Sequence, residues 1–171
     1  HSADNVIIRN LIFQDGGAHG INIYVSDNIF IQNVSSLNND KAGLVVNGST
    51  VEVENFHTAG NGWGGANVDQ GTGVTEYTEL IVDSTSTFAE TPQVWLDQPD
   101  EPDIVFTPTG ATYTEVTPGV YERVPDPEPT AVPNPQTGDT TNYSAYSLLI
   151  AVLLVGAVIA AFVIKRKSYS H

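Results

Sequence analysis

The chain has 171 residues, with 20 acidic and 6 basic side chains and a formal net charge of −14. This acidic balance argues against nucleic-acid binding, which needs lysine and arginine to neutralise phosphates. The absence of cysteine excludes a disulfide framework, a thiolate nucleophile and a cysteine-ligated metal. Methionine is absent as well, and we expect the chain to be the C-terminal part of a longer protein.

Residue types are sorted along the chain rather than mixed. All 10 prolines lie between Pro92 and Pro135, whereas 11 of the 15 glycines precede residue 92. Three of the 6 basic side chains fall within the last seven residues. A single globular domain does not normally show such sorting, so we expect several segments of different character.

The first segment contains an internal repeat. The sequence NVIIRNL at residues 5–11 recurs as NIFIQNV at 28–34 and as TVEVENF at 50–56, with offsets of 23 and 22 residues. A second block recurs with the same offsets, at residues 20–23, 43–46 and 65–68. Apolar residues alternate within both blocks, which predicts strands with one buried face. Two such strands cannot bury that face alone, so we expect successive repeats to stack.

Stacking places equivalent residues of successive repeats in columns. We expect two apolar columns, formed by Ile8, Ile31 and Val53 and by Ile23, Val46 and Val68. We also expect a ladder of hydrogen-bonded amides at Asn10, Asn33 and Asn55. A fourth repeat is less regular: Val74 keeps the period, but residues 80–83 match only after an insertion of about five residues.

This pattern resembles the right-handed parallel β-helix of the pectate lyase-like superfamily, whose coils have about this length and often carry an asparagine ladder. The resemblance predicts an all-β fold with β-helix coils over residues 1–91. Enzymes of that superfamily use carboxylates on successive coils, either to bind calcium or as an acid and base pair. It implies Ca²⁺ here only if coils upstream of His1 form a lyase site; no cofactor is otherwise expected.

The repeat alignment places several reactive side chains near one another. Ala18, Lys41 and Trp63 share one level, and the candidate groove residues are Asp15, His19, Asp40, Lys41 and Trp63. His57 and Asp69 supply similar chemistry. No two carboxylates recur at one repeat position on adjacent coils, and aspartates are common in tight turns. Turn and surface roles are therefore favoured, and we assign no catalytic or metal-binding residue.

The middle of the chain is predicted to end the solenoid and lead away from it. Residues 92–124 are expected to form cap strands and irregular structure, with strands at 93–96, 111–116 and 120–124 and with Trp95 as the plug over the last coil. Residues 125–139 form a proline-rich linker. Proline favours extended backbone and the repeated carboxylates repel one another, so we expect this linker to be stretched.

Residues 145–164 form an apolar segment of the length of a membrane-spanning helix, about 30 Å. Lys165, Arg166 and Lys167 follow directly and begin the tail of residues 165–171. By the positive-inside rule this tail is cytoplasmic and the preceding residues lie outside the cell.

The residues Asn134, Pro135, Gln136, Thr137 and Gly138 precede this apolar segment. Motif, apolar segment and basic tail together resemble the cell-wall sorting signal of Gram-positive surface proteins, whose usual form is Leu-Pro-any-Thr-Gly. The resemblance implies that a sortase cysteine attacks the Thr137 carbonyl and that the acyl group passes to a peptidoglycan precursor. Asn134 in place of leucine resembles the variants read by some class B sortases, although Gly138 departs from these. The alternative is an ordinary single-pass anchor.

Two functions remain open for the displayed coils. The first is binding or adhesion to a polysaccharide or a host surface, with the chain held in the membrane until sortase attaches it to the cell wall. The second is a polysaccharide lyase or glycoside hydrolase whose catalytic coils lie upstream of His1. Carboxylates paired on neighbouring coils would favour the second.

Overall fold

The computed structural model describes residues 3–127, and this part of the chain is an all-β parallel solenoid without helices. Its strands are β1 (Ile7–Gln14), β2 (Ile21–Tyr24), β3 (Ile29–Leu37), β4 (Ala42–Asn47), β5 (Thr50–Ala59), β6 (Gly64–Asp69), β7 (Thr78–Asp83), β8 (Thr87–Phe88), β9 (Val94–Leu96), β10 (Ile104–Thr109), β11 (Tyr113–Thr117) and β12 (Val120–Arg123).

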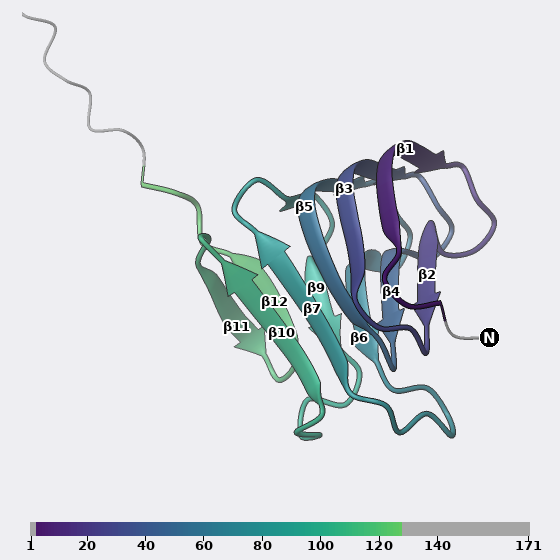
Figure 1. The fold of residues 1–171 in the computed structure, drawn as a ribbon. Helices are drawn as coiled ribbons and strands as arrows, with labels where there is room; N and C mark the ends of the chain where they lie inside the picture. The colour runs from purple at the N-terminus through teal and green to yellow at the C-terminus, as the bar shows by residue number, and fades with distance from the viewer. Residues whose placement is uncertain (1–2, 128–171) are drawn as a thin grey trace, which may run out of the picture. The chain divides into compact units, whose positions relative to one another are not determined.

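Two sheets stack the repeats side by side (Figure 1). One sheet has the order β1-β3-β5-β7-β10, and β8 also pairs with β5. The other has the order β11-β12-β9-β6-β4-β2. The chain alternates between the sheets, so each repeat adds one strand to both and buries apolar residues between them.

The strand register confirms both predicted apolar columns. Ile8 pairs with Ile31, which pairs with Val53 on the next coil. In the other sheet, Val46 pairs with Ile23 on one side and with Val68 on the other. The inner members Ile31, Val53, Val46 and Val68 are fully buried.

The predicted asparagine ladder is also confirmed. Asn33 Nδ2 donates to Asn10 Oδ1 at 3.2 Å, and Asn55 Nδ2 donates to Asn33 Oδ1 at 2.8 Å. All three residues have positive φ, between 50° and 59°. Asparagine tolerates this left-handed conformation better than most residues, so the bend within each strand and the ladder require the same residue type.

A second amide ladder, which the sequence analysis did not identify, lies inside the solenoid. Asn61 Oδ1 accepts from the backbone N–H of Asn39 at 3.0 Å and from its Nδ2 at 2.8 Å. Asn61 Nδ2 then donates to Glu90 Oε1 at 2.6 Å, and all three side chains are buried. The ladder thus ends on a carboxylate, a group that only accepts hydrogen bonds when ionised.

The irregular fourth repeat contains the predicted insertion. Val51 pairs with Leu80 and Val53 with Val82, so residues 80–83 do continue the column. Val74 does not keep the period, because it lies in the loop between β6 and β7, and the loop adds its residues before β7 begins. Val74 instead lies against Gly48, where a side chain on the glycine would collide with it.

Parallel strands extend beyond residue 91, where the sequence analysis expected the coils to end. β9 pairs parallel with β6, and β10 pairs parallel with β7. The β11–β12 hairpin then joins β9 in antiparallel orientation. Proline did not end the solenoid because the prolines of this region lie mainly in its loops.

Trp95 is not the plug over the last coil. Val94 and Leu96 point into the core, whereas Trp95, between them, is only partly buried and its Nε1 donates to Asp97. Aromatic residues from β10, β11 and β12 cover this end instead: the Phe106 ring lies 5.1 Å from those of both Tyr113 and Tyr121. Alternation along β9 places Trp95 on the outer face.

The NPQTG motif at 134–138, the apolar segment at 145–164 and the basic residues at 165–167 lie outside the described residues. Within residues 3–127, no helix is long and apolar enough to cross a membrane.

Candidate functional site

Three of the five candidate groove residues meet at the turn that leads into β2, β4 and β6. The backbone N–H of Lys41 donates to the Ala18 carbonyl at 3.1 Å, and that of Trp63 donates to the Lys41 carbonyl at 3.3 Å. These bonds place Ala18, Lys41 and Trp63 at one level of successive coils, as the repeat alignment predicts. His19 directly follows Ala18 in the chain.

The side chains of His19, Lys41 and Trp63 form a surface cluster, which we call the Trp63 patch. Lys41 Nζ lies 4.8 Å from the Trp63 ring centroid, and the His19 ring meets the indole edge to face at 5.3 Å and 84°. Trp63 is nevertheless 54% exposed. Lys41 over the ring and His19 at an edge-to-face angle fix the orientation of the indole, and about half of Trp63 stays open to solvent.

Folding favours the neutral form of His19. Burial lowers its pKa, and the nearby Lys41 charge lowers it further. Its Nδ1 accepts from the Ala42 backbone N–H at 3.3 Å, which assigns the ring proton to Nε2. The neutral His19 ring therefore stabilises the fold at pH values above the ordinary histidine pKa. This stabilisation is lost as the pH falls through the lowered pKa of His19.

Lys41 is available to an external ligand. Among residues 3–127, no carboxylate lies within ion-pair distance of Lys41. The salt bridge in this part of the chain joins Arg123 to Asp126 instead. The half-buried Lys41 beside the exposed indole offers hydrogen-bond donors next to an apolar platform.

The other two candidates, Asp15 and Asp40, belong to turns. Asp15 has a φ of 57°, and the equivalent positions on the next coils are Asn38 at 52° and Gly60 at 72°. Asp15 is therefore the residue that permits a left-handed turn. The Asp40 backbone N–H donates to the Gly16 carbonyl at 2.9 Å, and its side chain is exposed.

His57 is occupied within the exposed asparagine ladder. Its Nε2 lies 2.8 Å from Asn55 Oδ1, and its Nδ1 lies 2.7 Å from Thr87 Oγ1. Both ring nitrogens are thus used to join the end of this ladder to β8.

Contrary to the sequence analysis, carboxylates do recur at equivalent positions on adjacent coils, as at Asp4 and Asp27, and one such pair lies at the end of β6 and β9. Val68 pairs with Leu96, so the next residues, Asp69 and Asp97, occupy equivalent positions. Burial raises the pKa of Asp69 and the Asp97 charge raises it further, against hydrogen bonds from Gln98 and Gln70. The sequence analysis ends the repeat at residue 91, and the parallel pairing of β6 with β9 in the structure places Asp97 beside Asp69.

Replacing Asp69 with asparagine should stabilise the protein at pH 7. Because folding raises this pKa, stability is greatest below the ordinary aspartate pKa and decreases as the pH rises through the raised value. Asp69 is partly solvated, so the gain should stay below about 1 kcal/mol. Denaturant unfolding at pH 7 and pH 3 measures it, and the gain should vanish at pH 3.

Asp100→Asn is the matched control, because it removes the same charge from an exposed position. Equal gains from Asp69→Asn and Asp100→Asn would attribute the effect to net charge rather than to the Asp69–Asp97 pair.

Comparison with protein-family models, curated proteins and solved structures finds no match for this chain. Over residues 3–127, no group of three or more histidine or acidic side chains is arranged to hold a metal ion. The class of the protein is thus known from its own structure alone, and it is an all-β parallel solenoid. The Trp63 patch is its candidate binding site.

Proposed function

We propose that the protein is a cell-wall-anchored surface protein whose solenoid binds glycans through the Trp63 patch. The observation that carries the binding proposal is the exposed indole of Trp63, fixed by His19 and Lys41. A fixed aromatic ring offers apolar area at a small cost in side-chain entropy. The C–H face of a sugar ring fits such a platform, and Lys41 can donate to sugar hydroxyl or carboxylate oxygens. The resemblance to pectate lyase-like proteins supports the same ligand class.

The anchoring proposal rests on the order of sequence features at the C-terminus. The motif at 134–138 precedes the apolar segment at 145–164, and three basic residues follow. We propose that sortase cleaves after Thr137 and joins it to the peptidoglycan precursor. The displayed protein then loses the apolar segment that held it in the membrane.

Changing Thr137 to alanine tests the anchoring. The substitution removes the threonine whose bond to Gly138 the sortase would cleave. Wall-linked protein should therefore fall to background, and the protein should accumulate in the membrane fraction. Immunoblots of lysozyme-released wall and of membranes measure both pools. Thr140→Ala, just beyond the motif, is the control and should be anchored normally; normal wall linkage of Thr137→Ala would refute the assignment.

Changing Trp63 to alanine tests the binding. We expect the affinity for a bound glycan, identified on a glycan array, to fall at least about tenfold, as is common when an aromatic anchor is truncated. Tyr77→Ala is the matched control, because Tyr77 is also an exposed aromatic but lies beyond the opposite end of β6. Equal affinity of the Trp63→Ala and unaltered proteins would exclude the patch as the binding site.

A second candidate function, cleavage of a polysaccharide, is favoured by the Asp69–Asp97 pair. A carboxyl with a raised pKa beside a second carboxylate can act as a general acid. Release of reducing or unsaturated ends from acidic and neutral polysaccharides, abolished by Asp69→Asn, would favour this function over binding alone.

A further inference from the structure

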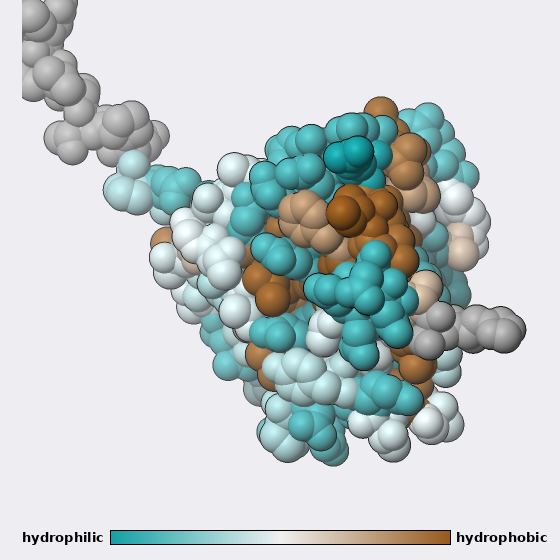
Figure 2. Space-filling model, in the orientation of Figure 1, coloured by the Kyte–Doolittle hydropathy of each residue, from teal (hydrophilic) through white to brown (hydrophobic). Residues whose placement is uncertain are grey.

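The two ends of the solenoid differ. At the C-terminal end, Phe106 and Tyr121 pack against the core, and Tyr113 packs on Phe106. Both ends have edge strands that pair on one side only, β10 and β11 at the C-terminal end and β1 and β2 at the opposite end, so the two ends differ in how the core between the sheets is covered. Figure 2 shows apolar surface on the side of the molecule where β1 lies.

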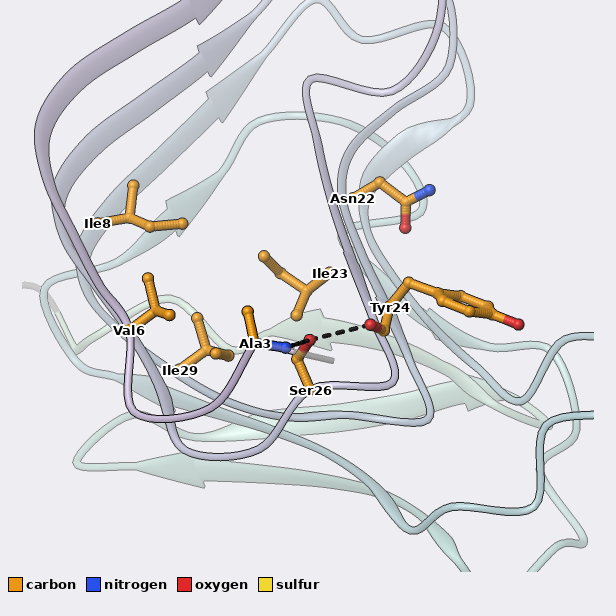
Figure 3. Close-up of a pocket in the computed structure, with 8 residues that line it drawn as sticks. All are labelled: Ala3, Val6, Ile8, Asn22, Ile23, Tyr24, Ser26 and Ile29. Carbon is orange, nitrogen blue, oxygen red and sulfur yellow. Dashed lines mark hydrogen bonds between the residues drawn. The ribbon is translucent and has the colours of Figure 1, made fainter. Parts of the chain in front are cut away.

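The core is open at the β1–β2 end. Between the two sheets lies a hollow of about 350 Å³, lined mainly by apolar side chains that include Val6, Ile8 and Ile23 (Figure 3). Ile8 and Ile23 are only partly buried, although Ile31 and Val46, one coil further in, are completely buried. The apolar columns therefore present their end residues to solvent, which is unfavourable for surface of this character.

Two exposed asparagine ladders end at the same end of the solenoid, and their hydrogen bonds all run in one direction. Asn28 Nδ2 donates to Asn5 Oδ1 at 2.7 Å, and Asn33 Nδ2 donates to Asn10 Oδ1 at 3.2 Å. In both cases the later coil donates and the earlier coil accepts. Within the part of the chain that the structure describes, the Nδ2 groups of Asn5 and Asn10 have no acceptor, and a preceding coil would have to supply an oxygen to each.

A second copy of this chain does not complement this end. Head-to-tail stacking would need an open core at the C-terminal end, and Phe106 and Tyr121 cover the core there. Head-to-head stacking would bring amide donors against amide donors and β1 against an antiparallel copy of itself. Each chain also carries a net charge of −14, so two copies repel one another.

We propose that the β1–β2 end binds one further parallel coil of the same repeat, supplied by the natural polypeptide on the N-terminal side of Ala3. The fit defines this coil: apolar side chains opposite Ile8 and Ile23, and an oxygen-bearing side chain, such as asparagine or aspartate, opposite Asn10. The coil completes the hydrogen bonds of β1 and β2 and fills the hollow. This docking does not depend on the proposed glycan binding.

Amide hydrogen exchange in β1 and β2 tests the proposal. The comparison is between the 171-residue chain and a longer form of the polypeptide that continues upstream of His1. In the longer form we expect exchange to slow by at least about tenfold, because the strands become interior. Equal exchange in the two forms would overturn the proposal. A dimer of the 171-residue chain with protected β1 amides would also overturn it, in favour of a second copy.

An insertion variant gives an independent measurement. A copy of residues 26–48 placed between Ser2 and Ala3 puts the counterparts of Ile31 and Asn33 opposite Ile8 and Asn10. We expect the same slowing of exchange and a higher unfolding midpoint. In a matched insert, the counterpart of Ile31 is changed to aspartate, and both gains should be lost. If the unaltered insert protects no β1 amide, the end does not accept a coil and the proposal is wrong.

Discussion

Replacing Phe56 with alanine should lower the free energy of unfolding by about 3–5 kcal/mol, the usual cost of truncating a buried phenylalanine. Phe56 has the largest of the fully buried side chains, and its ring lies 6.1 Å from that of Phe88 at an angle of 62°. Alanine would leave a cavity between coils whose backbones are hydrogen-bonded to one another and cannot collapse into it. Urea unfolding followed by circular dichroism measures the loss.

Phe30→Ala is the control for this substitution. Phe30 lies on the outer face of β3, pairs with Glu52 and is only partly buried. Its truncation should cost about 1 kcal/mol or less, because solvent fills the space it leaves. If the Phe56 and Phe30 variants lost equal stability, the two phenylalanines would not differ in packing as the structure requires.

Replacing Asn61 with alanine should cost about 3 kcal/mol, because it removes the centre of the buried amide ladder. Asn61 Nδ2 donates to both Glu90 Oε1 and the Ser36 carbonyl, and its Oδ1 accepts two hydrogen bonds from Asn39. Several buried polar groups would lose a partner at once, each at a cost of about 1–3 kcal/mol unless water replaces it. Thermal and urea unfolding measure the loss.

The exposed ladder provides the matched control. Asn33→Gly also removes a ladder amide, but glycine keeps the left-handed backbone at this position, where φ is 54°. Water can bond the amides of Asn10 and Asn55 that remain, so we expect a loss of about 1 kcal/mol or less. A loss as large as that of Asn61→Ala would show that burial does not set the strength of these ladders.

The asparagines show which ladders can be recognised from sequence. Asn10, Asn33 and Asn55 recur at offsets of 23 and 22 residues, so the sequence reveals their ladder. The buried ladder joins Asn39 and Asn61 to Glu90, a different residue type that lies after the irregular insertion. The step from Asn39 to Asn61 keeps the offset of 22 residues, but the first coil has Gly16 at this position and the ladder continues to Glu90 with a different residue type and spacing. Only two members of the ladder therefore repeat, because sequence alignment recognises repetition and not hydrogen-bond complementarity.

By itself, the sequence determined the stacking of the repeats, the register of both apolar columns and the level shared by Lys41 and Trp63. These follow from a period of 22–23 residues and from alternation along the strands, which are local properties. Only the tertiary structure decided that β9 joins the solenoid beside β6, which turns Trp95 outward and places Asp97 next to Asp69. This pairing follows an irregular loop, and contacts between distant residues decide it rather than local pattern.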